Sequence, residues 1–237
     1  MKRIKILVPV ITDIWNGPLS EEMAVCKEFD TSLEIINLVK GPVSIDDWFD
    51  ATWAALHVVQ EAIKAEKEGF NGMIVYCFDD PGVRAAKEAV TIPVVGLGEA
   101  SAHIAALISH KFGIVTAGLP DKTSAVIWDN LRMWELDHKC VGVKPVGIPV
   151  LRLKDDKDQE ERNLTEFAAE LISMGAEAIV LGCGSMLGVA EPVSKKLNIP
   201  IVIPARAALK LMESLIAMNL SQSKKGFGTP TEKLRTC

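Results

Sequence analysis

The sequence predicts an α/β fold made of two pseudo-symmetric lobes, each with its own parallel sheet, and three observations support this. Short apolar runs alternate with longer amphipathic stretches along the 237 residues, as they do in consecutive βαβ units. The run at 72–76 is continuously apolar, which is typical of a strand covered on both faces. The alternating pattern then starts again at residue 112.

Each expected element follows from apolar periodicity and from the turn residues that bound it. In the first half we expect strands at 4–9, 33–38, 72–76 and 92–97, and helices at 20–28, 50–68 and 81–90. In the second half we expect strands at 112–116, 141–143, 178–182 and 199–203, and helices at 123–136, 163–174, 189–197 and around 205–218. The charged segment 152–162 is expected to be a solvated helix start or a connection between lobes.

The second half of the chain repeats the first. The stretch GFNGMIVYC (69–77) falls on GAEAIVLGC (175–183) at an offset of 106, and IPVV (92–95) falls on IPIV (199–202) at 107. Matching glycine, cysteine and Ile-Pro at nearly one offset exceeds the general likeness of βα units. We therefore expect a first lobe at 1–105, a second lobe at 106–220, and a polar surface tail at 221–237. The helix around 205–218 is expected to pack back on the first lobe.

Composition narrows the class of partner. The formal net charge of -5 argues against nucleic acid or an anionic membrane and favours a small-molecule ligand. The apolar run at 6–11 is too short for a secretory signal, and no run approaches the roughly 18 residues of a membrane span, so we expect a soluble cytoplasmic protein. Five scattered cysteines, an odd number, are typical of reduced thiols and not of a disulfide framework or a paired zinc site.

Two of the cysteines occupy equivalent places. Cys77 and Cys183 each stand where an expected strand meets the following helix, the usual ligand edge of a parallel sheet. Free N–H groups and the helix dipole are expected to lower a thiol pKa there and to hold a carboxylate or imide oxygen. Cys26 and Cys140 are expected to be small buried hydrophobes, and Cys237 to be incidental in the tail.

Two opposed thiols suit the inversion of a carbon acid. One thiolate removes the proton from one face while the other thiol delivers a proton to the opposite face, so neither a metal nor a cofactor is required. Backbone N–H groups after the two cysteines would stabilise the enolate oxygen. We expect these donors at Phe78, Asp79, Gly184 and Ser185.

The stretches CFDDPGVRAAKEAVTIPVVGLGEAS (77–101) and GAEAIVLGCGSM (175–186) resemble the aspartate/glutamate/hydantoin racemase superfamily, most closely its hydantoin and allantoin racemase branch. The resemblance covers nearly the whole chain. It implies two Rossmann-like lobes with the active site between them, cofactor-independent racemisation by Cys77 and Cys183, and a homo-oligomer. It also implies substrate-binding positions, which are Phe78, Asp79, Thr116, Gly184 and Ser185.

One departure from the family pattern concerns the substrate. The family usually has an Asn-Pro-Asn-Thr type motif after the first strand, whereas this chain has Val8, Pro9 and Val10 there. The two valines remove side-chain hydrogen bonding, so we expect Val10 to form an apolar wall. Trp15 and Asn16 could reshape the pocket further. The substrate, and the enantiomer that each cysteine serves, stay open at this point.

Several other functions remain alternatives. They are a cysteine-dependent decarboxylase or cis-trans isomerase of a small dicarboxylic acid, a small-ligand-binding protein and a dithiol redox pair. GLGEAS (96–101) lacks the third glycine of a dinucleotide fingerprint, GLPDKTS (118–124) lacks the glycine that precedes the lysine of a phosphate loop, and the four histidines show no metal-ligand spacing. Glu99 and Ser101 would line the cleft, although Ser101 is equally explained as a helix N-cap.

Overall fold

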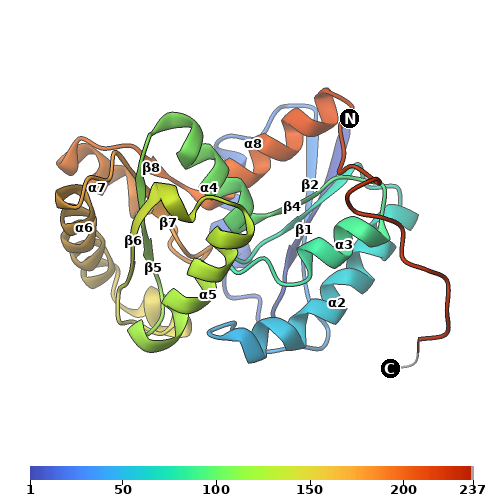
Figure 1. Cartoon of the computed structure of the whole chain (residues 1–237), viewed down its shortest axis with the longest axis horizontal. Helices are drawn as coiled ribbons and strands as arrows, with labels where there is room; N and C mark the ends of the chain where they lie inside the picture. The colour runs from blue at the N-terminus through green and yellow to red at the C-terminus, as the bar shows by residue number, and fades with distance from the viewer. Residues whose placement is uncertain (236–237) are drawn as a thin grey trace.

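The computed structural model describes residues 1–235, with the side chains of all of these except residues 121, 122 and 154. Two four-stranded parallel sheets form two lobes that lie side by side, with helices packed around them (Figure 1). The first sheet has the order β2-β1-β3-β4 and consists of β1 (Lys2–Val8), β2 (Thr31–Asn37), β3 (Gly72–Val75) and β4 (Val94–Gly96). The second has the order β6-β5-β7-β8 and consists of β5 (Phe112–Thr116), β6 (Cys140–Pro145), β7 (Ala178–Leu181) and β8 (Ile201–Val202). The predicted fold class is confirmed.

The two sheets share their register as well as their strand order. Met73 of β3 pairs with Lys5 and Val94 in the first sheet. In the second sheet, Ile179 of β7, which the sequence repeat makes equivalent to Met73, pairs with Gly113 of β5 and with Ile201, the repeat equivalent of Val94. The ends of β3 and β7 therefore occupy equivalent positions in the two lobes, in agreement with the sequence repeat.

The helices are α1 (Asn16–Ala24), α2 (Trp48–Lys67), α3 (Val83–Ala89), α4 (Leu97–Ile108), α5 (Pro120–Met133), α6 (Lys157–Ser173), α7 (Ala190–Leu197) and α8 (Pro204–Ala217), with short 3₁₀ turns at Asp137–Lys139 and Val150–Asp155. Most helices connect successive strands of one sheet, whereas α4 connects the two sheets and α8 follows the last strand. Asp47 caps α2 by accepting a hydrogen bond from the Asp50 N–H, and Asp156 caps α6 by accepting one from the Gln159 N–H. The charged segment at 152–162 is thus a helix start.

Helix α4, which the sequence did not predict, crosses from one lobe to the other. It follows β4 of the first sheet but packs against β7 and β8 of the second (Figure 1). Its Ala102 and Ala105 lie in a core cluster formed mainly by the second lobe, while Leu97 and Ala100 lie in a larger cluster that spans both lobes. Because its exposed positions include the apolar Leu107 and Ile108, it lacks the mainly polar face that identifies a helix in sequence. The expected boundary between residues 105 and 106 falls inside it.

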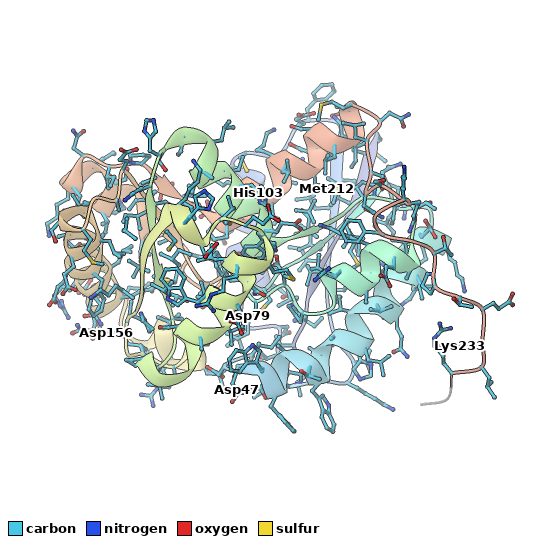
Figure 2. The ribbon with its side chains drawn as sticks, in the orientation of Figure 1. Asp47, Asp79, His103, Asp156, Met212 and Lys233 are labelled. Carbon is cyan, nitrogen blue, oxygen red and sulfur yellow. The ribbon has the colours of Figure 1, made fainter. Side chains whose placement is uncertain are left out.

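Helix α8 makes the reciprocal crossing. It follows β8 of the second sheet and packs against α1, β3 and β4 of the first lobe, and it also packs along α4. Met212 of α8 (Figure 2) covers Gly72, where an added Cβ would lie 2.3 Å from the Met212 sulfur. The buried carboxylate of Glu213 accepts hydrogen bonds from the Glu28 N–H at 2.8 Å and the Thr31 hydroxyl at 2.7 Å.

The segment after α8 lies along the surface of the first lobe and is tied to it. The Gln222 amide donates to the carbonyls of Val90 and Ile92 at 2.9 Å, and Lys224 donates to the carbonyl of Lys87 at 2.8 Å. Cys237 lies outside the described residues. Within residues 1–235, none of the helices has the length and apolar character needed to cross a membrane.

Replacing the buried Met212 tests the crossing of α8. Met212→Ala removes the side chain that fills the space over Gly72, so it should lower the free energy of unfolding by about 2–4 kcal/mol. Met218→Ala, at an exposed position just past α8, should change it by less than about 0.5 kcal/mol. Urea unfolding of both variants measures the difference. Equal effects of the two substitutions would show that α8 does not stabilise the first lobe through this contact.

Candidate active site

Cys77 and Cys183 line one cavity from opposite lobes. Each lies two residues past the end of its strand, Cys77 after β3 and Cys183 after β7. The cavity is walled by residues of both lobes. These residues are Val8, Pro9, Val10, Trp15, Ser44, Ile45, Tyr76, Cys77, Phe78, Val150, Cys183, Gly184 and Ser185. The two thiols are free, and both are partly accessible.

The wall of the cavity is mostly apolar. Val8 and Val10 contribute to it at the end of β1, opposite the loops that carry the cysteines. Trp15 also lines it, whereas the Asn16 amide is engaged elsewhere, donating to the Asn37 side-chain oxygen at 2.6 Å. Among the described residues that line the cavity, none carries a formal charge. The site therefore offers no ionic partner to a charged ligand.

Of the other residues predicted for the site, Phe78, Gly184 and Ser185 line the cavity, but Thr116 and Asp79 do not. The buried Thr116 hydroxyl donates to the Gly182 carbonyl at 2.7 Å. Thr116 thus supports the backbone next to Cys183 and does not reach into the cavity. Asp79 belongs to the Cys77 loop, and its backbone carbonyl accepts a hydrogen bond from the Asn130 amide of α5 at 3.0 Å.

Tyr76 ties the two cysteine loops together. Its hydroxyl donates to the Gly184 carbonyl at 2.8 Å, across the lobe interface. An added Cβ at Gly184 would lie 2.7 Å from the Tyr76 ring, so this close approach requires glycine. Sequence reasoning assigned Tyr76 to a strand and missed this contact, although its position directly before Cys77 was a signal. It also missed Ser44, Ile45 and Val150, which loops bring to the cavity.

Asp80 anchors the Cys77 loop to the start of α4. Its carboxyl accepts hydrogen bonds from the backbone N–H groups of Gly98 at 2.9 Å and Glu99 at 2.8 Å. The residue adopts a left-handed backbone with φ of 50°, and an added Cβ at Gly96 would lie 2.2 Å from its carboxyl carbon. Burial raises the Asp80 pKa well above its usual value, against the lowering effect of these N–H groups.

The prediction that the strand ends lower the thiol pKa values is wrong. Burial raises the pKa of Cys77 well above its usual value, and the nearby Asp79 carboxylate raises it further. Burial also raises the pKa of Cys183, to about 11, although hydrogen bonds from Ser185 act in the opposite direction. Burial disfavours the charged thiolate more than the local N–H groups stabilise it.

Asp79 is itself a perturbed acid. Burial raises its pKa from 3.8 to about 7, and repulsion by the carboxylates of Asp46 and Asp47 adds to the effect. Asp47, at the start of α2, lies on the same side of the molecule as Asp79 (Figure 2). A carboxyl with this pKa changes its charge near neutral pH, and Asp79 does so within the Cys77 loop.

Glu99 and Ser101 do not line the cavity. Glu99 forms an ion pair with Lys87 at 2.5 Å, and Ser101 lies within α4, where its hydroxyl donates to the Leu97 carbonyl at 2.7 Å. His103 bonds to the Glu99 carbonyl on the exposed surface of the same helix. In residues 1–235 no three His, Cys, Asp or Glu side chains are arranged to hold a metal ion.

The raised pKa of Asp79 predicts a pH-dependent effect of Asp79→Asn. Because the Asp79 carboxyl binds its proton more tightly in the folded state than in the unfolded state, the protein loses stability as the pH rises from about 4 to about 7. The neutral asparagine avoids this loss, so the variant should match the parent protein at pH 4 and exceed its unfolding free energy at pH 8 by roughly 2–4 kcal/mol. Urea unfolding at both pH values measures this, with Asp129→Asn on the exposed face of α5 as the control. An Asp79→Asn effect that is the same at both pH values would contradict the raised pKa.

The chain has relatives over nearly its whole length. A sequence model of the Asp/Glu/hydantoin racemase family matches residues 23–212. A hydantoin racemase from Paenarthrobacter aurescens is 33% identical over 206 residues, covering 86% of each chain, and one from Rhizobium meliloti is 30% identical over 222 residues, covering 93% of this chain and 91% of that one. The structure of allantoin racemase from Klebsiella pneumoniae is similar with a TM-score of 0.93 at 29% identity, covering 100% of this chain and 97% of that one. The protein therefore belongs to the hydantoin and allantoin racemase branch of the Asp/Glu/hydantoin racemase family and is an enzyme of the isomerase class.

Proposed function

We propose that the protein is a cofactor-independent racemase that inverts a carbon next to a carbonyl by proton transfer to and from Cys77 and Cys183. One observation carries the proposal: thiols at equivalent strand ends of opposite lobes line the same cavity. Inversion requires a base on one face of the stereocentre and an acid on the other. Two lobes related by a pseudo-twofold repeat supply one such group each.

The chemistry follows from the order of proton transfers. A thiolate removes the proton, the electron pair of the broken C–H bond moves into the carbonyl as an enolate, and the opposite thiol protonates the carbon from its other face. A thiol with a raised pKa is the weaker acid, so its thiolate is the stronger base towards a weakly acidic carbon. The raised pKa values of Cys77 and Cys183 are therefore compatible with this role, although they reduce the thiolate population at neutral pH.

The enolate needs hydrogen-bond donors in the cavity. The backbone N–H groups of Asp79 and Ser185 lower the pKa values of Cys77 and Cys183 respectively, so we assign them to the two sulfurs. This leaves the N–H groups of Phe78 and Gly184, residues that line the cavity, as our proposed donors to the enolate oxygen. Phe78 and Gly184 come from opposite lobes, so a ring with two carbonyls could contact both.

The uncharged wall favours a neutral substrate. A free amino acid would bring an ammonium and a carboxylate into a cavity whose lining residues offer no opposite charge, and burying unpaired charges is costly. A hydantoin-type ring has no formal charge and presents carbonyl and N–H groups to the backbone. Val8 and Val10 favour an apolar substituent on that ring. A dicarboxylic acid, the substrate class of the decarboxylase alternative, is disfavoured for the same reason as an amino acid. Homo-oligomerisation and a cytoplasmic location remain predictions.

Racemisation assays on single enantiomers test the proposal. The purified protein, without added cofactor and in the presence of EDTA, should invert a 5-alkylhydantoin faster than allantoin, aspartate or glutamate, as followed by chiral chromatography. Cys77→Ala and Cys183→Ala should each lower the inversion rate by at least about 100-fold, since each removes one acid/base group. Cys26→Ala, at a half-buried cysteine outside the cavity, is the matched control and should retain activity. Inversion that survives either substitution at the cavity would contradict a two-thiol mechanism, and binding without turnover of any substrate would favour a ligand-binding role.

A further inference from the structure

The two thiols have equivalent backbone surroundings but different side-chain neighbours. The backbone N–H of the residue two positions later lowers the pKa of each thiol, Asp79 for Cys77 and Ser185 for Cys183. At these equivalent positions, one lobe places a carboxyl and the other a hydroxyl. The Ser185 hydroxyl oxygen lies 2.9 Å from the Cys183 sulfur, within hydrogen-bond distance. The repeat is therefore broken at the positions that act most directly on the sulfurs.

The two side chains act in opposite directions on a thiolate. A hydroxyl can donate to a negatively charged sulfur and stabilise it, whereas a carboxylate beside the sulfur repels the same charge. Cys77 faces Asp79 and Asp80 of its own loop, both acidic, and Cys183 across the cavity. Each of these groups disfavours a negative charge on Cys77 once it is itself ionised.

Other acidic groups also face Cys183, but none is on its own loop. Asp79 from the opposite lobe and Glu160 from α6 both disfavour its thiolate, and they act less strongly than the Ser185 hydrogen bonds. Asp79 in turn faces Asp46 and Asp47. Burial is the largest cause of the raised pKa of both thiols, and the loops that carry them differ in having a hydroxyl beside Cys183 and a carboxyl beside Cys77.

We infer, on the basis of the proposed two-thiol mechanism, that Ser185 and Asp79 are positioning residues that, in the reactive form of the site with one thiol ionised, place the negative charge on Cys183 and the proton on Cys77. This reactive form takes the proton from its substrate with Cys183: the C–H bond breaks, an S–H bond forms, and the electron pair enters the carbonyl. The S–H bond of Cys77 breaks as its proton goes to the opposite face of the carbon. Nothing is oxidised or reduced, and exchange with solvent returns the proton from Cys183 to Cys77.

Alkylation rates resolved by residue test this assignment. The protein is treated for one fixed short time with iodoacetamide at pH 6–11, and mass spectrometry of the peptides gives the midpoint for each cysteine, defined as the pH at which half of that cysteine is modified. The midpoint of the pH profile should lie at least about one pH unit lower for Cys183 than for Cys77. A lower midpoint for Cys77, or coincident midpoints, would overturn the inference.

Substitutions separate the two positioning residues. Ser185→Ala should raise the Cys183 midpoint by about one pH unit, and Ser185→Thr, which keeps a hydroxyl, should restore it. Asp79→Asn should lower the Cys77 midpoint by about one pH unit, because it removes the neighbouring carboxylate. Ser194→Ala in α7 and Asp129→Asn in α5 are matched controls away from the cavity and should leave both midpoints unchanged. If Ser185→Ala and Asp79→Asn shift neither midpoint, the two residues have no positioning role.

Failure of this inference can be told apart from failure of the proposed function. If Cys77→Ala and Cys183→Ala both abolish inversion but Cys77 is alkylated at the lower pH, the racemase proposal stands and the charge assignment is wrong. If Cys183 has the lower midpoint but neither substitution affects inversion, the thiols titrate as inferred and the two-thiol mechanism fails, and the inference, which rests on that mechanism, fails with it.

Discussion

The reciprocal packing of α4 and α8 across the two lobes is the contact on which the position of both thiols depends. Each helix leaves the last strand of one sheet and packs on the strands of the other, and the two helices pack along each other. This arrangement fixes how the two sheets face one another, so their equivalent strand ends meet at one cavity. Asp80 connects this helix packing to the active site, because its carboxyl joins the Cys77 loop to the first N–H groups of α4. Tyr76 links the two cysteine loops, because its hydroxyl donates a hydrogen bond to the loop of Cys183.

The repeat explains why there is one site with two similar groups, and its exceptions explain how the site is used. Strand order, register and the positions of the cysteines follow the repeat. The residues two positions after the cysteines do not, and neither does the apolar wall formed by Val8 and Val10. In the proposed mechanism, the repeated backbone supplies two opposed proton-transfer groups. The side chains that differ between the lobes set the charges of these groups and the shape of the substrate cavity.

Much of the fold could be predicted from sequence, since continuous apolar strands and the repeated Gly, Cys and Ile-Pro positions are local signals. Helix α4 could not, because its buried residues belong to two core clusters and its exposed positions include the apolar Leu107 and Ile108. Phe78, Val10, Gly184 and Ser185 were predicted for the site and line the cavity, as do both cysteines. Thr116 and Asp79 do not, since the Thr116 hydroxyl bonds to the Gly182 carbonyl and Asp79 is buried in the Cys77 loop outside the cavity lining. The thiol pKa values were predicted in the wrong direction because burial, which depends on contacts between distant segments, outweighs the local N–H groups.

The most direct test of the central claim, that the two thiols act on opposite faces of one carbon, is α-proton exchange in heavy water followed by NMR. Cys77→Ala and Cys183→Ala are each incubated with the separate enantiomers of a 5-alkylhydantoin. We expect each variant to exchange the α-proton of one enantiomer only, without inversion, and the two variants to act on opposite enantiomers. Exchange of the same enantiomer by both variants would place the two thiols on one face and contradict the account.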